Sequence, residues 1–234
     1  MPHSDVPFDQ APVGRNPATR VILSRRSVRE GYEQRPVPVD VVEEILRCGL
    51  AAPSSKNARP WRLHVVTDRQ LLCELANAMA TADGADSYVP KDPLTGRPRP
   101  DWPSSVADSA AALRSVPLGI FVENRGVFSR GRSVLASISG EDLRGCLVGY
   151  TMEILGIGAA VTNMLLAASS LGVQALFIGD VCVAEKVIAA RLGIACDLIG
   201  ALALGYSQAP VPPGRVHYGV SDETRVVWHR PREA

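Results

Sequence analysis

Apolar side chains recur every three or four residues in several stretches of this chain, a spacing typical of amphipathic helices. The clearest stretch runs from Val37 to Ala51, with Val39 and Asp40 near its start. Pro53 follows at once and is expected to end that helix, because proline cannot continue one. Further helices are expected over residues 18–25, 68–81, 148–171 and 183–192.

Short segments rich in branched apolar residues lie between these helices and are typical of strands. The segment from Trp61 to Thr67 alternates in the manner of a strand, and the segment from Pro117 to Glu123 has the composition of a buried one. Further strands are expected over residues 173–178 and 198–205. Strands that alternate with helices predict an α/β or α+β domain with one central sheet.

Two segments fit neither pattern. Residues 82–105 contain five prolines and show no apolar periodicity, and a loop of this length in a compact domain is usually functional or disordered. We interpret it as a flap over a pocket, with a plain disordered insertion as the alternative. Residues 125–144 form a second, arginine-rich insertion.

The domain organisation follows from these boundaries. Residues 1–17, rich in acids and prolines, are expected to be a disordered tail without the features of a signal peptide. Residues 18–209 form one domain that carries both insertions. Residues 210–234 have too little apolar periodicity to fold alone, so they are either a loose tail or an extension that reaches over a partner subunit.

One uncharged stretch, from Ile154 to Gly179, is long enough to span a bilayer. It contains several polar residues, and its character changes near Gly172. A core helix that ends at this glycine, followed by a buried strand, explains the stretch better than a membrane span.

Composition excludes several classes of function. The 234 residues include 25 basic and 24 acidic side chains, so a net charge of +1 provides no general field for nucleic acid or anionic membranes. Five scattered cysteines without a C-x-x-C pair are typical of reduced thiols in a cytoplasmic protein. The four histidines are equally dispersed, so neither a metal site nor a catalytic triad is expected.

The chemical signal is concentrated in two segments near the start. The first, Arg25-Arg26-Ser27-Val28-Arg29, offers permanent cations and a hydroxyl, which suit a phosphate. The second runs from Ala51 to Trp61 and offers small hydroxyls, an amide and a Pro-Trp step, which suit the polar edge of a flat heterocycle. Together they indicate a phosphorylated aromatic cofactor.

These residues resemble the motifs of the FMN-dependent nitroreductase family. The Arg-Arg-Ser-x-Arg motif is similar to its phosphate motif, and Ala-Ala-Pro-Ser-Ser-x-Asn-x-x-Pro-Trp is similar to its most recognisable signature. The uncharged helix before Leu171-Gly172 and the Ala201–Tyr206 segment resemble its central helix and last strand. The order and spacing of these motifs extend the resemblance from about Val21 to Trp228.

The resemblance implies an α+β fold, a three-layer sandwich whose mostly antiparallel central sheet is flanked by helices. It also implies an obligate homodimer with two FMN sites at the interface, to which both chains contribute. The expected cofactor contacts are Arg25, Arg26, Ser27, Arg29, Pro53, Ser54, Ser55, Asn57, Ile178, Gly179 and Arg215. Among these, Gly179 would allow a backbone N–H to approach the flavin N5, and Arg26 is also expected to pair with Glu30 or Glu33 at the surface.

The implied activity is the reduction of nitroaromatics, quinones or similar small molecules by NADH or NADPH, in a ping-pong scheme. The flavin performs the chemistry, so no side chain is expected to be catalytic. Two alternatives remain open: an oxidase or dehydrogenase of amide-like or cyclic dipeptide substrates, and a flavin-binding redox sensor without turnover. Other relatives cut the flavin itself or act in dehalogenation.

Individual residues carry further expectations. Trp61 is expected to pack in the core, and Asn163, a polar residue on an apolar helix, is expected to make a contact between helices. Basic residues of the two insertions are candidates for a rim around an anionic ligand: Lys91, Arg97, Arg99, Arg125, Arg130 and Arg132. A lysine or asparagine contact that the family places before the Pro117 strand has no clear counterpart here.

Overall fold

The computed structural model describes residues 16–99, 101–211 and 227. The chain divides into two compact units, one formed by Met1–Arg26 with Pro212–Ala234 and the other by Ser27–Val211. Within the first unit, Asn16 caps helix α1 (Pro17–Ser24) by accepting a hydrogen bond from the Ala18 N–H at 2.9 Å. All further elements belong to the second unit.

A four-stranded antiparallel sheet forms the centre of the second unit, with the strand order β1-β2-β4-β3. Every neighbouring pair is antiparallel, and a register irregularity between Val122 and Glu123 interrupts the pairing of β2 with β4. The edge strands are therefore β1 and β3. The bounds are β1 (Trp61–Val66), β2 (Leu118–Asn124), β3 (Gln174–Ile178) and β4 (Asp197–Gly205).

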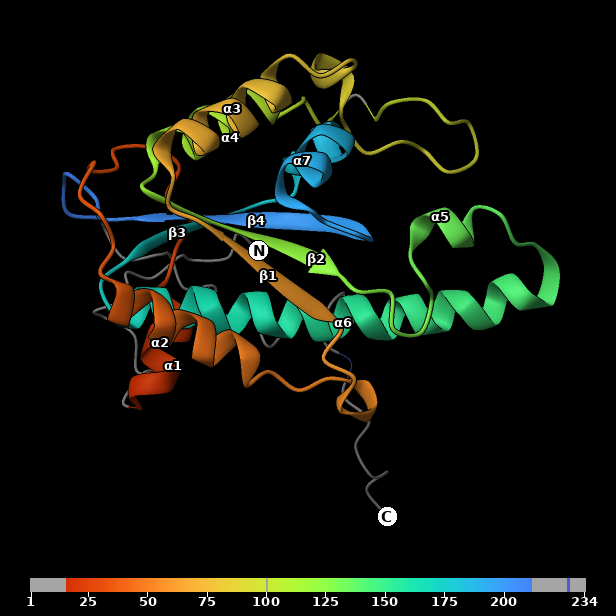
Figure 1. Ribbon diagram of the computed structural model, residues 1–234, viewed down its shortest axis with the longest axis horizontal. Coiled ribbons are helices and arrows are strands. Elements are labelled where there is room, and N and C mark those ends of the chain that lie inside the picture. Colours follow the sequence, from red (N-terminus) through yellow and green to blue (C-terminus); the bar gives the residue numbers. More distant parts are fainter. Residues whose placement is uncertain (1–15, 100, 212–226, 228–234) are drawn as a thin grey trace. The chain divides into compact units, whose positions relative to one another are not determined.

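Helices cover both faces of this sheet and make the unit a three-layer sandwich (Figure 1). Because side chains alternate along a strand, neighbouring residues of β2 enter different cores: Ile120 packs toward α2 and α6, and Phe121 packs toward α3, α4 and α7. The α+β sandwich expected from the sequence is confirmed. The helices are α2 (Val39–Leu50), α3 (Arg69–Ala80), α4 (Val106–Ser115), α5 (Arg132–Leu135), α6 (Gly140–Ser170) and α7 (Glu185–Leu192).

The contact between α2 and α6 explains the two residues whose packing was expected from the sequence. Asn163 Nδ2 of α6 donates a hydrogen bond to the Cys48 carbonyl of α2 at 3.1 Å, so its role as a helix–helix contact is confirmed. Trp61 is only 5% exposed and packs in the same core, which confirms that it is a packing residue.

The observed elements follow the predicted pattern with three main differences, one of which is the short helix α5 inside the second insertion. Helix α6 begins at Gly140, eight residues before the predicted start. The last residues of the arginine-rich insertion are therefore helical and do not form a loop. Helix α4 was not predicted at all, because alanines at 107, 110, 111 and 112 give it little apolar contrast between its faces.

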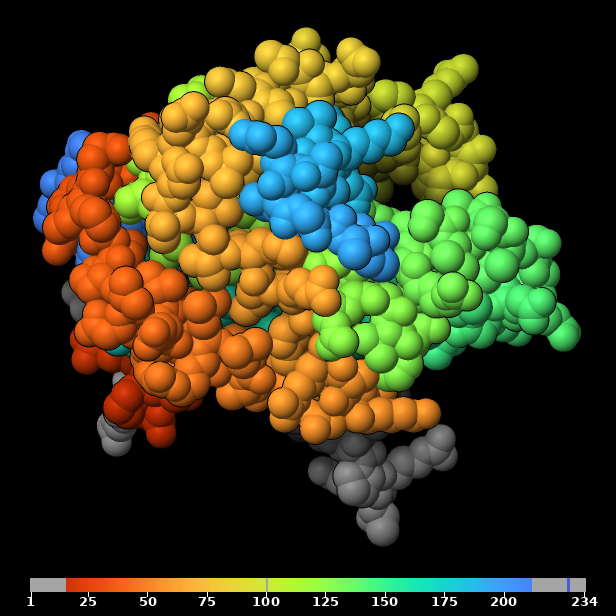
Figure 2. Space-filling model, in the orientation of Figure 1, coloured from red at the N-terminus to blue at the C-terminus, as the bar shows by residue number. Residues whose placement is uncertain are grey.

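The flap has a local hairpin-like structure without long regular elements. Lys91 and Pro98 form an isolated antiparallel bridge, and the Ser104 hydroxyl donates to the Ala85 carbonyl at 2.6 Å and closes the base. The flap and the second insertion lie on the same side of this unit, in yellow-green and green (Figure 2).

Among the described residues, α6 alone has the length and apolar composition that a membrane crossing requires. Its buried residues, which include Ile157, Ala160 and Met164, pack in the core on one face of the sheet. This packing is typical of a core helix.

Candidate functional site

A polar cavity of about 210 Å³ lies where the end of β3 meets the start of α4. Three of the expected cofactor contacts line it together: Arg29, Ile178 and Gly179. Arg29 and Gly179 are exposed, so a ligand can reach both. The remaining lining residues are Ser105, Asp108, Ser109, Leu176, Phe177 and Asp180.

Asp180 fixes one wall of this cavity against another. Its Oδ2 atom accepts hydrogen bonds from the hydroxyls of Ser105 at 2.7 Å and Ser109 at 2.6 Å. These two serines lie four residues apart at the start of α4 and therefore share a helix face. The turn that carries Gly179 is thus tied directly to α4.

The motif that contains Arg29 is held beside β3. Ser27 forms a parallel bridge with Ala175 on the outer edge of that strand, and the Val28 N–H donates to the Ala175 carbonyl at 3.2 Å. Ser27 is half-buried, whereas Arg29 is exposed and lines the cavity. The backbone contact with β3 thus fixes the position of the Arg29 backbone beside the cavity.

The second expected motif has an unusual backbone between α2 and β1. Lys56, Asn57 and Arg59 all have positive φ angles, of 51°, 53° and 46°, a left-handed conformation that costs non-glycine residues about 1–2 kcal/mol each. The Ser54 hydroxyl accepts the Arg59 N–H at 3.0 Å, and Asn57 Oδ1 accepts Arg59 Nε at 3.1 Å. Such strain concentrates at functional segments and persists where surrounding contacts maintain it.

A glycine of α6 allows this segment to approach the helix closely. A Cβ atom at Gly156 would lie 3.2 Å from Ser54 Cβ and 3.5 Å from Pro60 Cγ. The segment that carries Pro53, Ser54, Ser55 and Asn57 therefore rests on the middle of α6, beside edge strand β1.

Within one chain, the structure does not bring the two motifs into one cavity. Ser27 and Arg29 lie at the β3 edge of the sheet, whereas residues 53–57 precede β1 at the opposite edge. Three inter-strand spacings, roughly 14 Å, separate these edges. None of residues 53–57 lines the cavity around Arg29.

Three other expected contacts are placed separately. Arg25 and Arg26 belong to the first unit, where the Arg25 N–H donates to the Val21 carbonyl at 3.0 Å at the end of α1. Arg215 and most of the 210–234 extension lie outside the described residues, as does most of the 1–17 tail.

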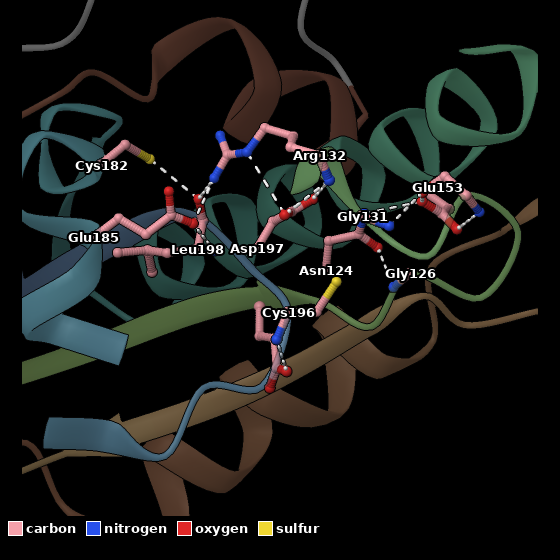
Figure 3. Close-up of polar contacts among 12 residues, drawn as sticks. Asn124, Gly126, Gly131, Arg132, Glu153, Cys182, Glu185, Cys196, Asp197 and Leu198 are labelled. Carbon is pink, nitrogen blue, oxygen red and sulfur yellow. Dashed lines mark hydrogen bonds and ion pairs between the residues drawn. The ribbon is translucent and has the colours of Figure 1, made fainter. Parts of the chain in front are cut away.

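A buried carboxylate attaches the second insertion to the central helix (Figure 3). Glu153 Oε2 accepts hydrogen bonds from Asn124 Nδ2 at 2.9 Å and from the Ser129 hydroxyl at 2.6 Å, and Oε1 accepts the Phe128 and Ser129 N–H groups. Burial alone would raise the pKa of Glu153, but these hydrogen bonds outweigh it and hold the pKa below its ordinary value.

Arg132 belongs to a second part of this network. Its backbone N–H donates to both Asp197 oxygens, at 3.0 and 3.1 Å, while its guanidinium pairs with Glu185 and donates to the Leu198 carbonyl at 3.0 Å. Burial raises the pKa of Asp197. Arg132 is thus paired within the chain while its side chain stays 41% exposed, and its place in a basic rim stays a prediction.

The cavity residues Ser105, Asp108 and Ser109 were missed in the sequence analysis. Their spacing of three and four residues would place all three on one face of a helix, and Pro103 precedes them as a start signal. They occupy the region before β2 where no family-type contact was found. Metal-binding groups of three or more His, Cys, Asp or Glu side chains are absent from the described part of the chain.

Glu123 predicts a pH dependence of stability. Its buried carboxylate accepts hydrogen bonds from His64 Nε2 at 2.9 Å and from the Ala195 and Cys196 N–H groups. Burial raises its pKa, but these contacts lower the pKa overall. A carboxylate whose pKa is depressed in the folded state stabilises the fold at pH values above its ordinary pKa of about 4.3. This stabilisation is lost as the pH falls through the folded-state pKa.

The Glu123→Gln variant should therefore be less stable than the wild type at pH 7, and the difference should shrink below about pH 4.5. Urea unfolding from pH 7 to pH 3.5 measures this difference directly. Because the wild type and the variant both contain Asp197, its contribution to the pH dependence of stability cancels in the difference. The raised pKa of Asp197 would otherwise change stability in the opposite direction. A difference that grows as pH falls would contradict the prediction.

Comparison with known proteins adds independent information. Residues 22–206 match the sequence model of the Nitroreductase family. A protein of Archaeoglobus fulgidus described as an NADH dehydrogenase/NAD(P)H nitroreductase is 33% identical over 105 residues, which are 42% of this chain and 58% of that protein. The NADH dehydrogenase of Thermus thermophilus is 47% identical over 51 residues, 22% of this chain and 24% of that protein. These matches span less than two thirds of each relative's length.

Solved structures show the same fold. A nitroreductase with bound FMN from Desulfitobacterium hafniense aligns with a TM-score of 0.64 at 18% identity, over 93% of this chain and 100% of that one. The NADPH:FMN oxidoreductase of Vibrio harveyi, complexed with NAD+, aligns with a TM-score of 0.63 at 18% identity, over 94% of this chain and 80% of that one.

Proposed function

The chain belongs to the nitroreductase family, and from this premise we propose that it is an FMN-dependent oxidoreductase that uses NADH or NADPH to reduce a small organic acceptor. The observation that carries the proposal is the cavity that the exposed residues Arg29 and Gly179 line together. Arg29 provides a permanent cation for the polar edge or phosphate of FMN, and the glycine allows close approach to the backbone. FMN, when bound, supplies the hydride chemistry.

The size of the cavity bears on how FMN fits. At about 210 Å³ it is smaller than the 300–1,000 Å³ typical of ligand sites, so this cavity has room for only part of the cofactor. The hydroxyls of Ser54 and Ser55 and the amide of Asn57 suit the rest, but they lie at the other edge of the sheet. We therefore place these groups on a second copy of the chain.

The surface of α6 supports such a homodimer. Leu147, Val148 and Leu155 are large apolar side chains, and they are 47%, 57% and 61% exposed. Apolar side chains grouped on one helix are typical of a protein interface. We also propose, from the sequence alone, that the extension over residues 210–234 reaches over the partner subunit; most of it lies outside the described residues.

A complementation experiment tests whether each site needs two chains. Arg29→Ala and Asn57→Ala variants, each expected to bind FMN weakly, are co-expressed with different tags and purified as the mixed dimer. If Arg29 and Asn57 of different chains share a site, one of the two sites is intact, and about half of the wild-type FMN should be recovered. No recovery would mean that both residues act within one chain.

The activity itself is tested by the visible spectrum of the purified protein before and after anaerobic NADPH or NADH. Flavin bands that bleach on addition are the expected result. Bands that persist with either nicotinamide but bleach with an organic substrate would replace the reductase with an oxidase or dehydrogenase. Flavin bound without any turnover would indicate a redox sensor. A protein that cannot be reconstituted with FMN would contradict the proposal.

A further inference from the structure

The cavity around Arg29 holds more negative than positive charge. Among the lining residues that the structure describes, Arg29 is the single cation, whereas Asp108 and Asp180 are carboxylates. Arg29 forms no ion pair with either of them or with any other described residue. No cation of the described residues is therefore in direct contact with either carboxylate.

The two carboxylates are held in different ways. Asp180 is fixed, because one of its oxygens accepts hydrogen bonds from both Ser105 and Ser109. Asp108 lies three residues after Ser105 in the chain and lines the same cavity as both serines. It is exposed and lines the cavity, and no described residue forms a hydrogen bond or an ion pair with its carboxylate.

Negative charge beside a redox cofactor affects one of its oxidation states more than the other. Reduction adds two electrons to FMN, and its reduced ring readily carries a negative charge, whereas the oxidised ring is neutral. Nearby carboxylates repel that added charge, and the repulsion is stronger in a cavity than in bulk water because the effective dielectric constant is lower.

We propose that Asp108 and Asp180 lower the reduction potential of the bound flavin and so make the reduced enzyme a stronger electron donor. This inference rests on the proposed FMN site in the same cavity. It assigns a tuning role to two residues of this chain, with Asp108 acting by its charge alone and Asp180 also positioning the turn at Gly179.

The test measures the midpoint potential of bound FMN by equilibration with a reference dye, in the wild type and in Asp108→Asn. The variant should bind reduced FMN about tenfold more tightly relative to oxidised FMN. For a two-electron couple this ratio corresponds to a midpoint potential about 30 mV higher. The shift should become smaller in 1 M salt, because salt screens an exposed charge.

Two further variants separate charge from shape. Asp108→Glu keeps the negative charge and should stay near the wild-type potential. Asp40→Asn removes an exposed carboxylate of α2 that does not line the cavity, and it should leave the potential unchanged. Equal potentials for Asp108→Asn and the wild type would overturn the inference.

The outcomes also distinguish this inference from the proposed function. A wild-type protein that does not bind FMN refutes the proposed function, whereas bound FMN with an unshifted potential refutes only the tuning role. If Asp108→Asn loses FMN, Asp180→Asn is measured in its place, because its amide oxygen still accepts the serine hydroxyls. An unchanged potential in that variant overturns the inference equally.

Discussion

Replacing Arg29 with alanine should raise the dissociation constant for FMN by about 10- to 100-fold. A hydrogen bond to a charged group contributes about 1.5–3 kcal/mol, and 1.4 kcal/mol corresponds to a factor of ten in affinity. Arg29 is exposed and lines the cavity, so its loss should affect the ligand more than the fold. The double variant with Ser27→Ala should bind more weakly still.

The measurement is a titration of the apoprotein with FMN, followed by the quenching of flavin fluorescence. Arg47→Ala is a matched control, because Arg47 is an exposed arginine of α2 that pairs with Glu44 and lies outside the cavity. Arg29→Lys keeps the charge but loses the planar fork, so its affinity should be intermediate. An unchanged dissociation constant in Arg29→Ala would exclude this cavity as the cofactor site.

Replacing Glu153 with alanine should lower the free energy of unfolding by roughly 3–5 kcal/mol. The carboxylate is fully buried, and its removal leaves the Asn124 amide, the Ser129 hydroxyl and two backbone N–H groups without their acceptor. Each unsatisfied buried donor costs about 1–3 kcal/mol. In a chain of this size, the change corresponds to a fall in melting temperature of roughly 10 °C.

Thermal and urea unfolding of the purified variant measure this loss. Glu141→Ala serves as the control, because Glu141 is an exposed residue in the first turn of the same helix. Glu153→Gln retains one acceptor oxygen and should lose less stability than Glu153→Ala. A Glu153→Ala variant as stable as the Glu141→Ala control would contradict the assigned anchoring role.

The sequence predicted correctly those elements in which buried apolar positions repeat with the period of a helix or a strand. The apolar positions of α2 and the branched residues of β1 were recognised for this reason, and Trp61 and Asn163 have the roles that their chemistry indicated. Helix α4 was missed, because a helix rich in alanine has little contrast between its faces. The early start of α6 was missed because arginines and glycines in the insertion obscured its period.

The candidate site was only partly predictable, because it depends on contacts between distant segments. Arg29 and Gly179 were named from motifs, but Asp108 has no motif of its own and enters the cavity only through the packing of α4 beside the end of β3. The internal partners of Arg132 are likewise distant in sequence, at Glu185 and Asp197. The sequence alone does not distinguish such a paired arginine from an unpaired surface arginine.

By itself, the sequence determined the α+β class, most element positions and the two cofactor-type motifs, because helical and strand periodicity and motif chemistry are properties of neighbouring residues. Only the tertiary structure decided that the two motifs lie at opposite edges of the sheet and that two carboxylates line the cavity of Arg29. The physical reason is that the strand order β1-β2-β4-β3 comes from pairing and packing between residues far apart in the chain, which no local pattern encodes.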